Sequence, residues 1–218
     1  MINFAKYEKK IFSQNGEDGV IEAIFGLIGT TNKYFVEFGG GGGECNTRLL
    51  RDSGWDGLWM DNNDQEDQRV KKEFVTSKNI NNLLDKYNVP QEFDLLSIDI
   101  DGQDFWVWKA ITRRPRVVVI EYNGYLPTDS RKVVPENEDF SWDGTDYYGA
   151  GLEAMRLLGC SKNYTFAYLD FNLVNAFFIR NDCVPVGTQF DFRVVARTNP
   201  IKRKINVPWE VVNESLSL

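Results

Sequence analysis

The 218-residue sequence contains no histidine. A general base supplied by this chain must therefore be a carboxylate, a lysine, a tyrosine, a thiolate or a metal-bound group. Nucleophilic arrangements of the Ser–His–Asp and Cys–His kinds are excluded within the chain. Any acid–base chemistry has to be sought mainly among its carboxylates.

Cysteine is also scarce. The three cysteines, Cys45, Cys160 and Cys183, lie far apart and form no CxxC pair. An odd number without paired spacing argues against a disulfide framework or a zinc site. We expect a protein of a reducing compartment, the cytoplasm.

Long apolar runs and an excess of basic residues are both missing. The start, MINFAKYEKK, has no apolar signal region, so we expect neither secretion by that route nor membrane insertion. The net charge is −7 and the one basic run, residues 202–204, is short, which disfavours nucleic acid as a partner. The 42% hydrophobic content suits one domain, predicted to span residues 1–218.

The stretch YFVEFGGGGGE at residues 34–44 organises the rest of the chain. The apolar run predicts a strand that carries Glu37 and ends at the five glycines Gly39–Gly43. A helix is predicted over 44–53. Glycines let the chain turn sharply and let a ligand approach the backbone closely. A strand, a glycine turn and a helix are typical of α/β proteins that bind a nucleotide-like cofactor. The alternative is a merely flexible glycine loop.

Hydrophobic periodicity predicts a mostly parallel sheet with helices on both faces. Residues 1–30 read as a helical segment, with a helix capped by Ser13 and beginning at Gln14–Glu17. Two strands joined by a short link predict an antiparallel hairpin at the end of the sheet. The other predicted strands are 55–63, 74–76, 93–100, 116–122, 164–170 and 175–180, with an extended piece at 190–196. The other predicted helices are 64–72, 79–87, 105–111, 151–158 and 208–216.

Acidic residues gather where two of these strands end. Asp99, Asp101 and Asp104 follow one strand, and Glu121 and Asn123 end the next. Small molecules bind at this edge of parallel α/β sheets. Carboxylate and amide oxygens are also the metal ligands that Mg²⁺ and Mn²⁺ prefer. Without a metal, the same cluster would serve as a carboxylate base. The structural alternative is a turn at Asp101-Gly102 and a helix cap at Asp104.

Two further features belong to this predicted edge. Asp61 ends the second strand, where an acid accepts hydrogen bonds from ribose hydroxyls in nucleotide-binding folds. Residues 124–150 lack periodicity and carry several aromatic side chains, so we expect an acceptor loop or lid. Aromatic faces among acidic residues suit a sugar, and they equally suit an oligomer contact.

The glycine run does not fit the dinucleotide fingerprint G-x-G-x-x-G, because the third glycine is missing in each frame. Residues 37–43 fit acid-x-G-x-G-x-G instead, which resembles the first motif of class I S-adenosylmethionine (SAM)-dependent methyltransferases. Further segments resemble the FkbM-type branch of these enzymes: SQNGED, GWDGLWMD, LLSIDIDGQDFWVW, VVVIEYN and WDGTDYYGAGLEAMRLLG. A similar domain occurs in multidomain glycan-synthesis proteins of large algal viruses, for which the location would be the host cytoplasm.

The resemblance implies a Rossmann-like class I methyltransferase fold, a seven-stranded sheet whose seventh strand is antiparallel. It implies O-methylation of a sugar hydroxyl of a glycan, assisted by Mg²⁺ or Mn²⁺. The implied SAM-binding residues are Gln14, Glu17, Glu37, Gly39, Gly40, Gly41, Asp61, Asn62, Asn79 and Asp99. The implied base is Asp99 or Asp101, and the implied metal ligands are Asp101, Glu121 and Asn123, with Asp99 as the alternative aspartate. A Rossmann-type NAD-dependent oxidoreductase and a catalytically inactive glycan-binding module are the alternatives.

Overall fold

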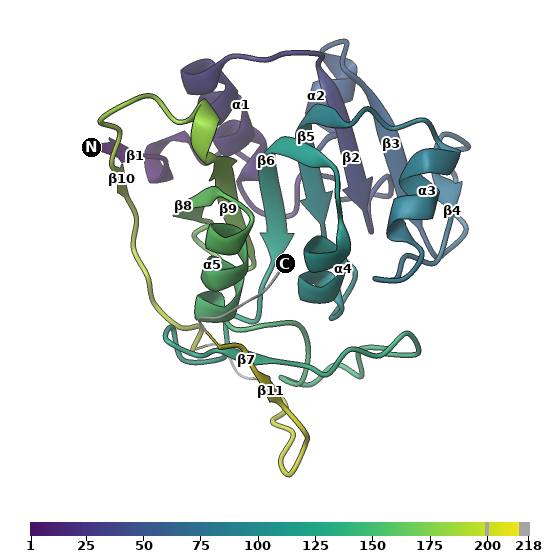
Figure 1. Ribbon diagram of the computed structural model, residues 1–218, viewed down its shortest axis with the longest axis vertical. Helices are drawn as coiled ribbons and strands as arrows, with labels where there is room; N and C mark the ends of the chain where they lie inside the picture. Colours follow the sequence, from purple (N-terminus) through teal and green to yellow (C-terminus); the bar gives the residue numbers. More distant parts are fainter. Residues whose placement is uncertain (199–200, 214–218) are drawn as a thin grey trace.

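The computed structural model describes residues 1–198 and 201–213 (Figure 1). Its centre is a seven-stranded sheet with the strand order β4-β3-β2-β5-β6-β9-β8. The strands are β2 (Tyr34–Phe38), β3 (Asp56–Asp61), β4 (Lys71–Lys72), β5 (Glu92–Ile98), β6 (Arg114–Glu121), β8 (Tyr164–Leu169) and β9 (Asn175–Arg180). β9 pairs antiparallel with both β6 and β8, and the remaining pairs are parallel. The prediction of an α/β protein with a mostly parallel sheet is confirmed.

Helices cover both faces of this sheet because the side chains of each strand alternate between two apolar cores. One core joins Val36 and Phe38 to α3 (Ile80–Lys86), α4 (Asp104–Ala110) and α5 (Leu152–Ser161). The other core joins Phe35 and Leu95 to α1 (Glu17–Ile28) and α2 (Arg48–Asp52). Figure 1 shows α4 and α5 in front of the sheet. Within the described chain, no helix combines the length and apolarity needed to cross a membrane.

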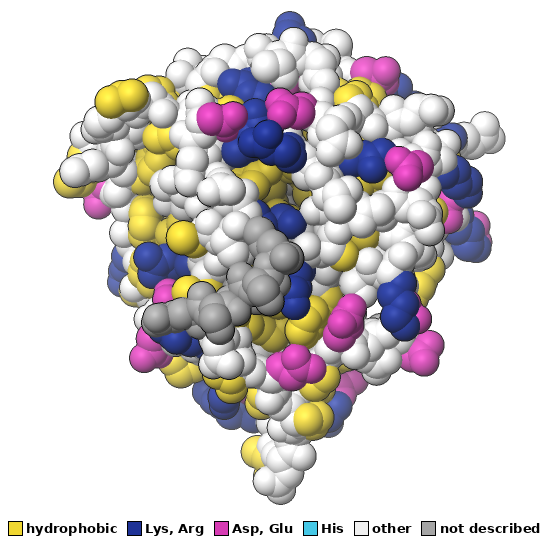
Figure 2. Space-filling view, viewed as in Figure 1, with side chains coloured by type: hydrophobic (Ala, Val, Ile, Leu, Met, Phe, Trp, Pro, Cys, Tyr) yellow, Lys and Arg dark blue, Asp and Glu magenta, His cyan; other side chains and the backbone are white. Residues whose placement is uncertain are grey.

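Short strands outside the sheet bring the C-terminal part of the chain back to its edges. β1 (Ile2–Asn3) pairs with β10 (Phe190–Asp191), and β7 (Lys132–Val133) pairs with β11 (Glu210–Val211). The single-turn helices η1 (Ala5–Tyr7) and η2 (Asn181–Cys183) complete the described elements. β7 belongs to the loop 124–150, so β11 holds that loop near the carboxyl ends of the strands (Figure 1). On the face shown in Figure 2, Lys and Arg side chains are interspersed with Asp and Glu.

Three sequence predictions were wrong because hydrogen bonds, either local or to a distant strand, override the pattern. Within the predicted helix 64–72, Lys71–Lys72 is β4 and the residues before it form bends and turns, because the carboxylate of Asp67 accepts the backbone N–H and the guanidinium of Arg69 and favours a turn over a helix. Residues 74–76 form no strand, since Asn79 bonds to the backbone of Phe74 and Thr76. In the predicted helix 208–216, Glu210–Val211 is a strand, and residues 214–216 lie outside the described chain.

Two helix starts also differ from the prediction. α1 begins at Glu17, because the carboxylate of Asp18 accepts the successive backbone N–H groups of Ile11, Phe12 and Ser13 and turns the chain before the helix. The helix after the glycine run begins at Arg48, not at residue 44.

Candidate functional site

A cavity of about 390 Å³ lies at the carboxyl ends of β2, β3 and β5. Seven of the residues predicted for the site line it: Gln14, Glu37, Gly39, Asp61, Asn62, Asp99 and Asp101. They come from four separate segments of the chain, three of which the parallel sheet brings to one edge. A volume of several hundred Å³ is in the range of small-molecule sites.

The glycine run turns the chain away from β2 at the wall of this cavity. Gly39 has a φ of +73°, and a Cβ there would lie 1.7 Å from the carbonyl oxygen of Asp99. Gly41 has a φ of +95°, and its Cβ would lie 2.3 Å from a methyl group of Val70. Positions 39 and 41 therefore require glycine. Gly40 and Gly41 do not line the cavity, although the sequence placed them at the cofactor.

Glu37 holds the loop that follows the glycines. Its buried carboxylate accepts hydrogen bonds from the Cys45 thiol at 2.9 Å, the Asn46 N–H at 2.8 Å and the Thr47 hydroxyl at 2.5 Å. Burial raises the pKa of Glu37, and these hydrogen bonds lower it again in part. The carboxylate is thus mainly engaged with residues 45–47, while part of the residue remains at the cavity wall.

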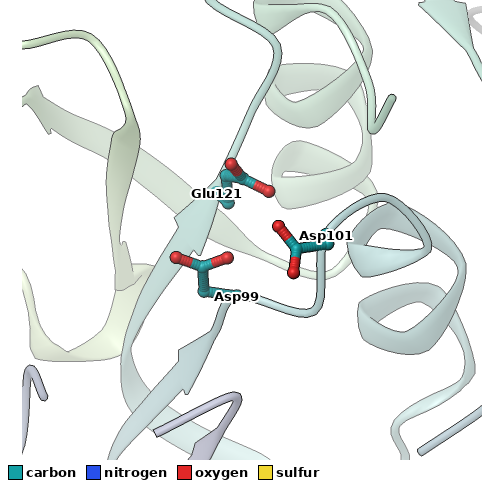
Figure 3. A group of neighbouring side chains, drawn as sticks. All are labelled: Asp99, Asp101 and Glu121. Atoms are coloured by element: carbon teal, nitrogen blue, oxygen red, sulfur yellow. The ribbon is translucent and has the colours of Figure 1, made fainter. Parts of the chain in front are cut away.

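Three carboxylates converge after β5 and β6. Asp99, Asp101 and Glu121 each offer an oxygen within 4.8 Å of the other two, and Figure 3 shows their side chains facing one another. Glu121 ends β6, while Asp99 and Asp101 follow β5 in the turn to α4. The buried Glu121 Oε2 accepts no hydrogen bond from residues 1–198 or 201–213. The three carboxylates could hold a cation, and a proton on one of them would serve the same purpose of reducing the negative charge.

Burial and mutual repulsion keep these groups from ionising readily. The pKa values of Asp99 and Glu121 lie well above their usual values. The main cause is burial, and the smaller cause is repulsion by neighbouring carboxylates; both disfavour the charged forms. Burial also raises the pKa of Asp101, and Arg197 opposes the rise at Glu121. A divalent cation would offset this concentration of negative charge.

Asp104 builds the turn that carries Asp99 and Asp101. Its carboxylate accepts the N–H groups of Ile100 and Gly102, each at 2.9 Å, and burial raises its pKa to about 6. Asp101 itself has a φ of +58°, an unusual conformation for a residue with a side chain. The expected cap of the following helix by Asp104 is therefore wrong, because the carboxylate faces backward into the turn.

Two other predicted residues, Glu17 and Asn79, do not line the cavity and are engaged in hydrogen bonds elsewhere. The carboxylate of Glu17 accepts from Asn15 and from Asn175. The Asn79 side chain bonds to the backbone at Phe74 and Thr76, a segment that does line the cavity. These residues hold the walls of the cavity in place.

Asn123 differs most from its predicted role as a metal ligand. Its amide nitrogen donates to the carbonyl oxygens of Asp146 and Tyr148, both at 2.8 Å, and its Oδ1 accepts from the Tyr125 N–H at 3.1 Å. The side chain is fully buried and ties together the two ends of the loop 124–150.

The loop 124–150 supplies one wall of the cavity. Phe140 and Trp142 line it, and the Phe140 ring packs against Gly102. Two contacts join this loop to the segment before α3. The Ser77 hydroxyl donates to Glu136 at 2.5 Å, and Lys78 pairs with Glu138 at 3.2 Å. Further hydrogen bonds join the loop to Gln103 and Trp106, so both sides of the cavity hold this wall in place.

Sequence reasoning missed several lining residues, among them Asn46, Gln103 and Asn175. Asn175 is the first residue of β9, and its position at a strand end was the one available signal. Comparison with known proteins found no family model that matches the chain and no curated protein that it resembles significantly.

Proposed function

We propose that this protein is a SAM-dependent O-methyltransferase that acts on a sugar hydroxyl of a glycan, with a divalent metal ion at the acidic cluster. The observation that carries the proposal is the shared cavity. Its wall includes the glycine turn after β2, Asp61 at the end of β3 and the acids Asp99 and Asp101 after β5. A bound methyl donor and the carboxylates would therefore share one space.

The topology supports a class I methyltransferase fold. β9 is the seventh strand of the central sheet in chain order, and it runs antiparallel between β6 and β8. The resemblance of the sequence implies this feature, and the cavity lies at the carboxyl edge of the parallel strands, where ligands of such sheets bind.

The residues present fit SAM in chemistry and in space. A Cβ at position 39 would overlap the carbonyl oxygen of Asp99, so the glycine lets the turn after β2 and the turn after β5 meet at the cavity wall. Asp61 would hold the ribose hydroxyls, with Asn62 beside the adenine and Gln14 at the amino-acid end. SAM supplies an electrophilic methyl group, and most of the rate would come from alignment of the acceptor oxygen in a dry pocket.

The acidic cluster fits a divalent cation. Asp101 and Glu121, with Asp99, would hold Mg²⁺ or Mn²⁺, whose chemistry is to lower the pKa of a bound hydroxyl. Either Asp99 or Asp101 would accept the proton of the sugar hydroxyl. Burial raises the pKa of both carboxyls, which strengthens them as bases.

The aromatic wall suits a sugar acceptor. Phe140 and Trp142 face the same cavity as the acids, and apolar ring faces can pack against a sugar while polar groups bind its hydroxyls. The loop that carries them would exclude water when it closes. We place the reaction in the cytoplasm, where the described cysteines, all unpaired, remain reduced.

Ligand-induced stabilisation tests the cofactor. The melting temperature should rise with SAM or S-adenosylhomocysteine and stay unchanged with NAD⁺ or NADH, because only a ligand of the native state stabilises it. Asp61→Ala should weaken SAM binding at least about tenfold, as expected for the loss of a charged hydrogen bond, and should reduce the rise in melting temperature accordingly. Asp56→Ala is the matched control, since Asp56 begins the strand that Asp61 ends. Stabilisation by NAD⁺ and not by SAM would reject the proposal.

Activity tests the acids. Transfer of a labelled methyl group to a panel of methyl glycosides should fall by at least about a hundredfold in Asp101→Asn and Glu121→Gln, in line with a lost base or metal. Glu92→Gln, at the exposed start of β5, should keep full turnover. Full activity in EDTA would remove the metal from the proposal and leave the carboxylate mechanism. Full activity of both site variants would reject the assignment.

A further inference from the structure

We infer that Asn175 supplies a fourth oxygen ligand to the divalent cation at the acidic cluster, in the place predicted for Asn123. The inference rests on the metal site of the proposed function and adds a residue to it. It is carried by the strand register, by an orphaned amide oxygen and by the hydrogen bond that orients the amide.

The register puts Asn175 beside the cluster. Asn175 and Glu121 are directly paired across the antiparallel strands β9 and β6, so their side chains project from the same face of the sheet. Ile98 pairs with Ile120 in the neighbouring strands β5 and β6, which puts Asp99, one residue further, level with Glu121. The three residues therefore occupy adjacent positions in one row across the carboxyl edge of the sheet.

Asn175 has an oxygen to offer. The side chain is only 1% exposed and lines the same cavity as Asp99 and Asp101. Its Oδ1 is buried and accepts no hydrogen bond within the described part of the chain. Buried amide oxygens are nearly always satisfied, so this atom indicates a ligand that the polypeptide does not supply. Glu121 Oε2, on its cross-strand neighbour, is orphaned in the same way.

A hydrogen bond fixes the orientation of the amide. Asn175 Nδ2 donates to Glu17 Oε1 at 2.8 Å, and Glu17 also accepts the side chain of Asn15 on the same oxygen at 2.9 Å. A carboxylate can only accept here, so the NH₂ group must face Glu17 and the oxygen must face away from it. Such a bond behind a ligand is what holds metal-binding side chains in their binding orientation. This gives the buried Glu17 a positioning role in place of contact with the cofactor.

The chemistry of the set suits a hard cation. Three carboxylates and one amide oxygen are the ligand types that Mg²⁺ and Mn²⁺ prefer, and they leave further positions for water or a sugar hydroxyl. Asn123 cannot take this role without giving up the three hydrogen bonds that hold the loop 124–150. The competing interpretation is that Asn175 Oδ1 accepts a hydrogen bond from the acceptor sugar, and the test below separates the two.

Titration of MnCl₂ alone into the EDTA-stripped full chain, followed by calorimetry, tests the inference without SAM or an acceptor. Asn175→Ala should weaken Mn²⁺ binding at least about tenfold, since even the loss of a residue behind a metal ligand commonly costs that much. Asn175→Asp should keep Mn²⁺ affinity near or above that of the wild type, because it retains an oxygen ligand. Mn²⁺ should also restore the melting temperature of Asn175→Asp more than that of Asn175→Ala.

Asn172→Ala is the matched control. Asn172 lies in the exposed turn of the same hairpin and also bonds to the N-terminal segment, through Asn15 Oδ1, without lining the cavity. This variant should bind Mn²⁺ as the wild type does. Circular dichroism checks that each variant is folded.

Three outcomes would overturn the inference. Wild-type Mn²⁺ affinity in Asn175→Ala, with weakened binding in Glu121→Gln, would leave the metal site intact and assign Asn175 to the acceptor. Equal losses in Asn175→Ala and Asn172→Ala would point to a loosened hairpin. Lack of Mn²⁺ binding by the wild type would reject both the inference and the metal of the proposed function, while stabilisation by SAM would still be judged separately.

Discussion

A Cβ at position 39 would occupy the space of the Asp99 carbonyl oxygen, at 1.7 Å, in a backbone conformation with a φ of +73°. Gly39→Ala should therefore cost about 3 kcal/mol from steric overlap and strain combined, a drop of roughly 6–12 °C in melting temperature for a domain of this size. Gly43→Ala, in the same run, meets nothing within 4 Å and should change stability by less than about 0.5 kcal/mol. Equal effects in thermal denaturation would contradict this account of the glycine turn.

Glu121 contributes repulsion to the metal-free site. In EDTA, Glu121→Gln should raise the melting temperature by roughly 2–4 °C, the shift expected for about 1 kcal/mol, because an amide removes the free-energy cost of either protonating Glu121 or holding its charge beside Asp99 and Asp101. Added Mn²⁺ should stabilise the wild type and leave the variant unchanged. Glu92→Gln should show no such rise, since Glu92 pairs with Arg114 and Arg180. A lower melting temperature for Glu121→Gln in EDTA would argue against repulsion at the cluster.

At the scale of elements, Lys162 connects the ends of two helices. It directly follows α5, and its Nζ donates to the carbonyl oxygens of Lys109 and Ile111 at the end of α4. Charged side chains of this kind satisfy the free carbonyls at a helix C-terminus. Burial lowers the pKa of Lys162 to about 8.

This lowered pKa predicts a pH dependence of stability. Between pH 8 and about 10.5 the unfolded chain holds the proton of Lys162 while the folded chain has released it. The free energy of unfolding contributed by this residue should therefore rise with pH through that window. Urea denaturation at pH 7.5, 9 and 10 should show the stability of the wild type increasing relative to Lys162→Met. A constant difference across these pH values would contradict the burial of the charge.

Elements were predicted best where apolar pattern and burial agree. The apolar runs around Phe35, Leu96 and Val118 form the central strands β2, β5 and β6, buried on both faces as their composition indicated. The polar segments were predicted worst. Residues 64–72 have the composition of a charged helix. Hydrogen bonds such as those that Arg69 donates to the Asp67 carboxylate instead hold the residues before β4 in turns.

At the scale of the whole molecule, one ligand in the cavity should protect segments that are distant in sequence. Addition of S-adenosylhomocysteine should slow amide hydrogen exchange together in the segments 37–46, 61–63, 73–77, 99–103 and 137–142, which contain most of the residues that line the cavity. β1 and β10 do not line it and should exchange at an unchanged rate. Protection confined to one segment, or spread evenly over the molecule, would contradict binding in this cavity.

Local patterns in the sequence were enough to predict the order of strands and helices along most of the chain, the glycine turn after Glu37, and the acids at the ends of β5 and β6. These features depend on local composition, because apolar periodicity, glycines and strand-end carboxylates can be recognised in a window of a few residues. A parallel sheet then brings strand ends together whatever the details of the loops. The cavity and its acidic cluster follow from that arrangement.

Which side chains are free to bind a ligand depends on the tertiary fold. Asn123 and Asn175 both lie at strand ends, but the Asn123 amide is fully hydrogen-bonded to the backbone of Tyr125, Asp146 and Tyr148. The Oδ1 of Asn175 has no hydrogen-bond partner in the described part of the chain. Asn175 owes its orientation to Glu17, 158 residues away along the chain. Hydrogen bonds of this kind join segments that the fold alone places side by side, so no local pattern can report them.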